Sequence, residues 1–239
     1  MKPYIRTIAW VSTFGIAMGV LEAAVVIYLR RLYFPGGFQF PLWAVETDIL
    51  FVELWREVAT IVMLAAVGAL AGRQKGERFA YFVYVFALWD LVYYIFLKLV
   101  LDWPPSLLTW DILFLLPVPW IAPVLAPCIV AGTMIAFSLL AISHTTETRD
   151  VHLVSRERWL VIIGALIVIF SFTVDWVRFE GPIIMQNMSA HRRIDYRVGS
   201  FVPSHFPWWI FVLGEGLILA GLARFRARIK WPDALAPLT

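Results

Sequence analysis

Six acidic side chains lie inside stretches of this sequence that are otherwise apolar enough to cross a lipid bilayer. They are Glu22, Glu53, Glu57, Asp90, Asp175 and Glu215. A charged side chain at the centre of a bilayer costs roughly 2.5 to 3.5 kcal/mol on the insertion scale, so each of these groups needs a partner or a protein-lined cavity. Such a carboxyl group can hold a proton, bind a cation or act as an acid or base.

The second apolar stretch carries a charged face. Glu53, Arg56, Glu57 and Thr60 follow one another at intervals of three and four residues, which places them on one side of a helix. A guanidinium group stays charged and can fork to two carboxylates. We therefore expect Arg56 to bridge Glu53 and Glu57.

The first apolar stretch combines small residues with an acid. Ser12, Gly15, Gly19 and Glu22 form a stripe at helical spacing. Two glycines four residues apart let the backbones of two membrane helices approach closely. The stripe predicts a close helix contact that leads up to Glu22.

The remaining acids differ in whether a basic residue lies near them in the sequence. Asp175 has Arg178 three residues later, which predicts a salt bridge within one helix. Four acids have no neighbouring cation of their own: Glu22, Glu57, Asp90 and Glu215. These four are the main candidates for binding a substrate or an ion. Glu53 and Arg56 are included as candidate binding residues beside them.

The composition is that of a multi-pass membrane protein. Hydrophobic residues make up 61% of the chain, charged residues 15%, and the mean hydropathy is +0.78. We expect an all-α bundle of six transmembrane helices in a single membrane domain. The predicted spans are Thr7 to Tyr28, Ile49 to Ala71, Ala80 to Val100, Trp120 to Ile142, Trp159 to Val177 and Trp208 to Leu222.

The segment before the fourth span is apolar but too short to cross a membrane. It runs from Ser106 to Leu116, after Pro104 and Pro105, and predicts a short interfacial or re-entrant helix. Because proline removes a backbone donor, the fourth span should be kinked or begin late. The prolines concerned are Pro117, Pro119, Pro123 and Pro127.

Lysine and arginine are distributed unequally between the two sides that these spans define. Twelve lie on one side: Lys2, Arg6, Arg73, Lys75, Arg78, Arg149, Arg156, Arg158, Arg224, Arg226, Arg228 and Lys230. Seven lie on the other: Arg30, Arg31, Lys98, Arg178, Arg192, Arg193 and Arg197. The positive-inside rule then predicts cytoplasmic termini, in a plasma membrane or a bacterial inner membrane.

This orientation places all six acids at or beyond the middle of the membrane, toward the outer face. The sequence therefore predicts a carboxylate-rich cavity that opens outward. The outer loop from Gly181 to Phe206 is long enough to cap it, and Arg192, Arg193 and Arg197 within this loop could bind an anionic head group. The net charge of +3 reflects the inner-leaflet bias and does not indicate nucleic-acid binding.

Several cofactor chemistries lack their usual signatures. No histidine pair lies within the predicted spans, so we expect no intramembrane haem. The nucleotide-binding, zinc-protease and serine-hydrolase motifs are absent, and the single cysteine, Cys128, cannot form an internal disulfide. No cofactor is identified, although carboxylate oxygens are suitable ligands for a hard cation.

A carboxylate-rich cavity of this kind is compatible with three candidate functions from different classes. The first, which we favour, is transport of a small molecule or ion coupled to protons or another cation. The second is an intramembrane enzyme acting on a lipid or isoprenoid-linked substrate, with paired carboxyl groups as acid and base. The third is an accessory subunit whose polar groups pair within a larger membrane complex. The expected partners are the lipid bilayer and, for the third function, other membrane subunits.

Overall fold

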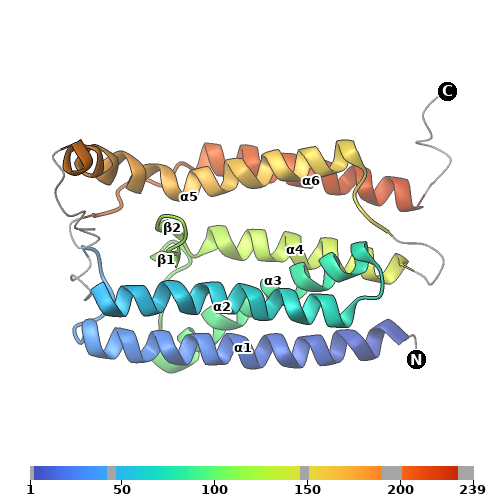
Figure 1. The fold of residues 1–239 in the computed structure, drawn as a ribbon, viewed down its shortest axis with the longest axis horizontal. Helices are drawn as coiled ribbons and strands as arrows, with labels where there is room; N and C mark the ends of the chain where they lie inside the picture. The colour runs from blue at the N-terminus through green and yellow to red at the C-terminus, as the bar shows by residue number, and fades with distance from the viewer. Residues whose placement is uncertain (1–2, 42–46, 146–150, 190–200, 231–239) are drawn as a thin grey trace.

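The computed structural model describes residues 3–41, 47–145, 151–189 and 201–230, and most of them are helical. The helices are α1 (Pro3–Tyr33), α2 (Thr47–Ala71), α3 (Lys75–Leu101), α4 (Leu125–His144), α5 (Ser155–Ser189) and α6 (Trp208–Lys230). They lie roughly parallel to one long axis, with α1, α2 and α3 on one side, α5 and α6 on the other, and α4 between them (Figure 1). The prediction of a predominantly helical bundle is confirmed.

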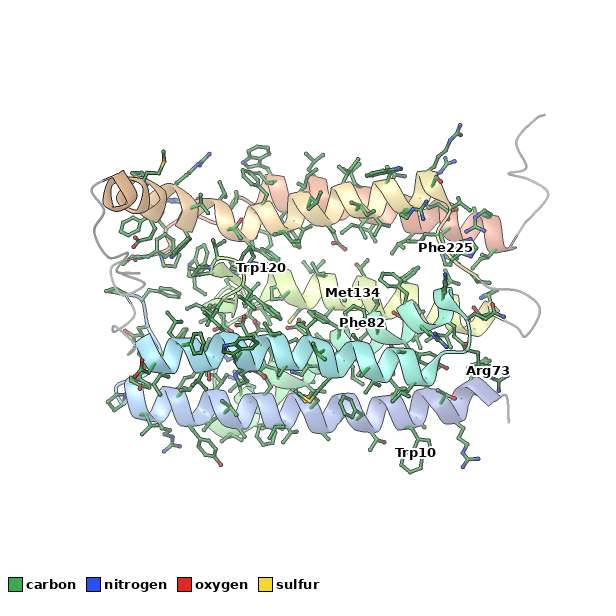
Figure 2. The ribbon with its side chains drawn as sticks, in the orientation of Figure 1. Trp10, Arg73, Phe82, Trp120, Met134 and Phe225 are labelled. Carbon is green, nitrogen blue, oxygen red and sulfur yellow. The ribbon has the colours of Figure 1, made fainter. Side chains whose placement is uncertain are left out.

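Five of the helices are long and apolar enough to cross a membrane. The qualifying stretches are Tyr4–Tyr33, Lys75–Leu101, Leu125–His144, Ser155–Pro182 and Trp208–Ile229. The helix α2, with its charged first half, is not among them. Large apolar side chains such as Trp10 point outward from the bundle (Figure 2), and 67% of the Trp10 side chain is exposed. An outer surface of this kind is compatible with lipid contact.

The segment between α3 and α4 is a β-hairpin, so the short helix predicted over Ser106 to Leu116 is wrong. The strands β1 (Trp110–Phe114) and β2 (Trp120–Pro123) pair antiparallel, with Trp110 opposite Pro123. Pro117 and Pro119 fall in the connection, where their missing N–H groups interrupt no ladder bond. A short apolar run does not distinguish a strand from a buried helix by periodicity alone.

The hairpin also decides where the fourth span begins. This span was predicted to start at Trp120, whereas α4 starts at Leu125, after the β2 strand. Backbone bonds from Val124 N to the Thr109 oxygen (3.0 Å) and from Leu125 N to the Leu107 oxygen (2.8 Å) attach the start of α4 to the hairpin. The expectation of a late start is thus confirmed: Pro117 and Pro119 lie in the hairpin connection, Pro123 ends β2, and Pro127 falls in the first turn of α4.

The interior combines apolar clusters with a few buried charged groups. Met18, Leu64, Tyr81, Phe137 and Phe225 belong to a core formed by α1, α2, α3, α4 and α6. Arg228 Nε donates to Glu157 Oε1 at 2.8 Å, and this ion pair connects the end of α6 with the start of α5. The hairpin lies at the opposite end of the bundle from the first residues of α1 and the last residues of α6 (Figure 1).

The glycine stripe of α1 packs against α3, which confirms the predicted close approach. A Cβ atom added at Gly19 would lie 2.8 Å from the Cβ of Val92 and 2.9 Å from the Trp89 carbonyl oxygen. At Gly15 the nearest atoms would be 3.2 Å away, on Leu88 and Val85. The two helices therefore come close enough to bring Glu22 of α1 beside the middle of α3.

We expect Gly19→Ala to destabilise the folded protein. The added methyl group would force α1 and α3 apart, an overpacking change that costs roughly 1 to 3 kcal/mol. The matched control is Gly132→Ala on α4, where an added Cβ meets nothing within 4 Å. Unfolding free energies measured in mixed detergent micelles would compare the two, and equal values for the two variants would contradict this account of the stripe.

Candidate functional site

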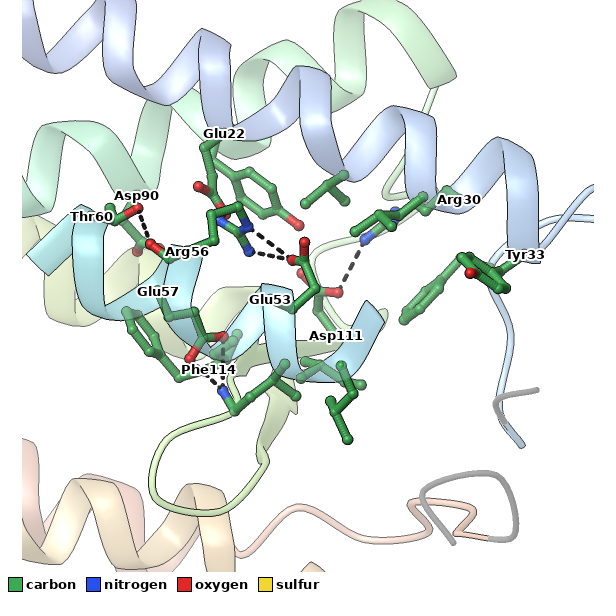
Figure 3. Close-up of a pocket in the computed structure, with 18 of the residues that line it drawn as sticks. Glu22, Arg30, Tyr33, Glu53, Arg56, Glu57, Thr60, Asp90, Asp111 and Phe114 are labelled. Atoms are coloured by element: carbon green, nitrogen blue, oxygen red, sulfur yellow. Dashed lines mark hydrogen bonds and ion pairs between the residues drawn. The ribbon is translucent and has the colours of Figure 1, made fainter. Parts of the chain in front are cut away.

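A cavity of about 200 Å³ lies between α1, α2, α3 and the β1 strand, at the hairpin end of the bundle. Four of the predicted acids line it, together with Arg56 and with Arg30 and Asp111, which were not predicted (Figure 3). The predicted acids in its wall are Glu22, Glu53, Glu57 and Asp90. Residues from three helices and a hairpin thus place their polar side chains around one space.

Arg56 connects α2 with α1. Its Nε donates to Glu53 Oε2 at 2.8 Å, and its Nη1 donates to Glu22 Oε1. The predicted bridge to Glu53 is confirmed, and the predicted bridge to Glu57 is wrong. Arg56 and Glu57 are neighbours in sequence, so their side chains leave the helix about 100° apart and do not face each other. Glu22, expected to lack a cation, receives this guanidinium group.

Glu57 instead binds the hairpin. The backbone N–H of Leu115, just after β1, donates to both carboxylate oxygens of Glu57, at 3.0 and 3.1 Å. An unpaired backbone N–H is expensive in a low-dielectric interior, and this bond satisfies one at the point where strand pairing ends. The contact fixes the position of the hairpin over the cavity.

A second ion pair closes the cavity wall between α1 and β1. Arg30 Nη2 donates to Asp111 Oδ1 at 3.1 Å, and the hydroxyl of Tyr94 donates to the other oxygen, Oδ2, at 3.2 Å. The Arg30 guanidinium group stacks 3.7 Å from the ring centroid of Trp103 and 4.3 Å from that of Phe38. This arrangement holds a buried cation with one carboxylate and two aromatic faces.

Sequence reasoning missed both members of this pair for identifiable reasons. Arg30 follows the end predicted for the first span, so it was counted among the outer-side cations, whereas α1 continues to Tyr33. Asp111 lies in the segment predicted as an apolar helix. Alternation of residue facing along β1 is the signal that would have brought Asp111 inward, and it depends on recognising a strand.

Asp90 is the cavity acid with the fewest partners among the described residues. It lines the cavity, and among the residues that the structure describes it forms no hydrogen bond or ion pair. Trp89, beside it, also lines the cavity. Asp90 is thus the cavity carboxyl group that is available to an incoming ligand.

Two of the predicted acids lie elsewhere. Glu215 on α6 accepts a hydrogen bond from the Thr133 hydroxyl on α4 and does not line the cavity. Asp175 lies on α5, and within the described part of the chain it forms no ion pair with Arg178, so that predicted salt bridge is wrong. Arg192, Arg193 and Arg197 fall outside the described residues.

The paired carboxylates of the cavity are divided among three sets of partners. Glu22 and Glu53 share Arg56, Glu57 takes a backbone N–H, and Asp111 takes Arg30 and Tyr94. In the described ranges, no group of three or more His, Cys, Asp or Glu residues is arranged to hold a metal ion. The arrangement can bind a proton or a cation that contacts one or two carboxyl groups at a time.

No protein-family model, curated protein or solved structure matches this chain.

Arg56→Gln should destabilise the protein because it leaves Glu22 and Glu53 in the bundle without their cation. Removing one partner of a buried ion pair costs roughly 3 to 5 kcal/mol. Arg178→Gln, at an exposed position of α5, is the control and should change the unfolding free energy little. Adding Glu22→Gln to Arg56→Gln should restore part of the loss, and a double variant no more stable than Arg56→Gln would contradict the pairing.

The stability of the hairpin end should depend on pH through Asp111. Burial raises the pKa of Asp111 from 3.8 to about 6, against the opposing effect of Arg30. Because the pKa in the folded protein exceeds that of an unfolded chain, the stability associated with Asp111 is full below about pH 4 and falls as the pH rises through about 6.

Thermal unfolding of detergent-solubilised protein tests this sign. The unfolding temperature of Asp111→Asn relative to the native protein should rise between about pH 4 and about pH 7, because the variant carries no ionisable group there. Asp102→Asn is the control, since the Asp102 side chain is exposed and its pKa is lowered by Lys98. A difference that stays constant with pH for Asp111→Asn would refute the assignment.

Proposed function

We propose that this chain is a six-span integral membrane protein that transports a small molecule or ion and couples transport to proton or cation binding in the cavity. The observation that carries this proposal is the charge of the cavity wall. Five carboxyl groups face two guanidinium groups, which leaves an excess of three negative charges when all are ionised. In a membrane interior such an excess must be neutralised by protons or by bound cations.

The dimensions of α2 support its role as a sixth span. Its 25 residues extend over about 37 Å, more than the roughly 30 Å of a hydrocarbon core. Its charged half faces the cavity through Glu53, Arg56 and Glu57. The first residues of α1 and the last residues of α6 lie at the same end of the bundle, as an even number of crossings requires (Figure 1).

The distribution of positive charge supports an outward-facing cavity. The end of the bundle where α1 begins and α6 ends carries the arginine run Arg224, Arg226 and Arg228, which the positive-inside rule assigns to the cytoplasm. The cavity lies at the opposite end, with the hairpin. A solute entering from the outer side would meet Arg30 and Asp111 first and the deeper acids afterwards.

The same cavity gives less support to an enzyme acting on a phosphate-linked lipid. Both cavity arginines are already paired with carboxylates, Arg56 with Glu22 and Glu53, and Arg30 with Asp111. An anionic head group would have to displace these carboxylates and would meet the uncompensated charge of the remaining acids. A cation relieves the same charge excess.

Ion movement in proteoliposomes tests the proposal. The protein would be reconstituted in vesicles that contain a pH-sensitive dye, and sodium, potassium or choline chloride would be added outside, one at a time. With the native protein, at least one of these cations should drive proton movement across the vesicle membrane. Asp90→Asn and Glu57→Gln should slow this movement by roughly tenfold or more, because each removes a titratable group from the cavity.

The matched control is Asp175→Asn, which changes an acid of α5 outside the cavity. It should retain the native rate within about twofold. Native vesicles in which none of the three cations moves protons, or equal rates in the Asp90 and Asp175 variants, would rule out coupled transport through this cavity.

A further inference from the structure

We propose that the cavity binds a small organic ammonium ion that also carries an oxygen acceptor, the chemistry shared by choline and ethanolamine. This inference rests on the proposed cation-binding function and specifies the class of cation. Three features of the cavity wall carry it. In the described part of the chain, the wall has a carboxyl group without a partner, a lining of aromatic rings, and buried N–H donors without an acceptor.

The unpaired carboxyl group is Asp90. It lines the cavity and has no hydrogen-bond or ion-pair partner among the described residues, while Glu57 is bound only through a backbone N–H. A cation between these acids would supply the missing positive charge without breaking the Arg56 or Arg30 ion pairs. Asp90 and Glu57 come from different helices, α3 and α2, and both line the cavity.

The aromatic lining favours an organic cation over a bare metal ion. The rings that line the cavity belong to Tyr33, Phe34, Phe38, Trp89, Tyr93, Tyr94 and Phe114. Aromatic faces attract ammonium and guanidinium groups, and carbon substituents on the nitrogen gain apolar contact as well. Arg30, stacked against Phe38 and Trp103, already shows an organic cation held in this way at the cavity wall.

Buried N–H donors in the cavity wall are the reason for expecting an acceptor oxygen on the ligand. The indole N–H of Trp89 is buried and has no acceptor within the described part of the chain, and the side chain is only 6% exposed. Nη1 of Arg30, also a cavity residue, is likewise buried with no acceptor among the residues that the structure describes. Leaving such a donor unsatisfied costs about 1 to 3 kcal/mol. An ammonium nitrogen offers no acceptor, whereas a hydroxyl or ether oxygen on the same ligand does.

Equilibrium binding of radiolabelled choline to the protein in phosphatidylglycerol nanodiscs tests whether the ligand is an organic ammonium ion. Empty nanodiscs give the background binding. Choline should bind saturably, and ethanolamine should compete with it. The uncharged isostere 3,3-dimethyl-1-butanol should compete at least about tenfold more weakly, because it lacks the cation. Equal competition by the neutral isostere, displacement by sodium at equal concentration, or no saturable binding of choline would overturn the inference.

Substitution of Trp89 tests the oxygen contact separately. Trp89→Phe keeps an aromatic face and removes the N–H, so it should weaken choline more than tetramethylammonium, which has no oxygen. The control is Trp120→Phe, because the Trp120 N–H is also buried without an acceptor among the described residues but does not line the cavity. Equal losses for the two ligands in Trp89→Phe would contradict the role of the oxygen.

The ammonium group could belong to a free amine or to a lipid head group, and the nanodisc composition distinguishes the two. Loss of choline binding when phosphatidylethanolamine replaces half of the lipid would assign the site to the lipid amine, and retained binding would assign it to a free amine. Both results support an ammonium site.

Failure of this inference is distinct from failure of the proposed function. Sodium-driven proton movement without choline binding would leave coupled transport standing and would refute the ammonium class. Choline binding without proton movement by any of the three cations would support the ammonium site and refute coupled transport. Asp90→Asn should abolish choline binding, and Asp175→Asn should preserve it.

Discussion

The cost of placing charge in a low-dielectric bundle governs how the hairpin end of this protein is organised. Arg56 is the central case, because its guanidinium group joins Glu53 on its own helix to Glu22 on α1. α1 and α2 share few contacts elsewhere, since each packs mainly on α3. The ion pair therefore connects two helices across the space that becomes the cavity. Without it, two carboxylates would remain buried without compensation.

The same constraint explains how a β-hairpin is accommodated at the end of a helical bundle. Its backbone groups need hydrogen-bond partners that apolar surroundings do not supply, and the Leu115 N–H finds one in Glu57. Asp111 brings a carboxylate into the wall, and this is matched by Arg30 and Tyr94. The hairpin is thus attached to α1, α2 and α3 through polar contacts that also define the cavity. A ligand that competes for Glu57 or Asp111 would act directly on the position of the hairpin.

The cavity has two chemically different parts. Near Arg30 the charges are matched and enclosed by aromatic rings. The Asp90 carboxyl group, by contrast, lines the cavity without a hydrogen-bond or ion-pair partner among the described residues. The ion-paired part fixes the shape of the cavity wall, and the part near Asp90 has a net negative charge that a bound cation would neutralise. Glu215 shows that an acid in an apolar helix need not belong to this site, because Thr133 on the neighbouring helix provides a local donor.

Helical period and hydropathy are local properties, so the long apolar helices, the close approach at Gly15 and Gly19, and the pairing of Glu53 with Arg56 could be predicted from the sequence. Which acids share a space depends on how the helices pack. Glu22 meets Arg56 only because α1 and α2 both pack on α3, and Asp111 enters the wall only because its segment forms a strand. Partner choice for a buried charge depends on elements distant in sequence, and spacing along one helix cannot specify it.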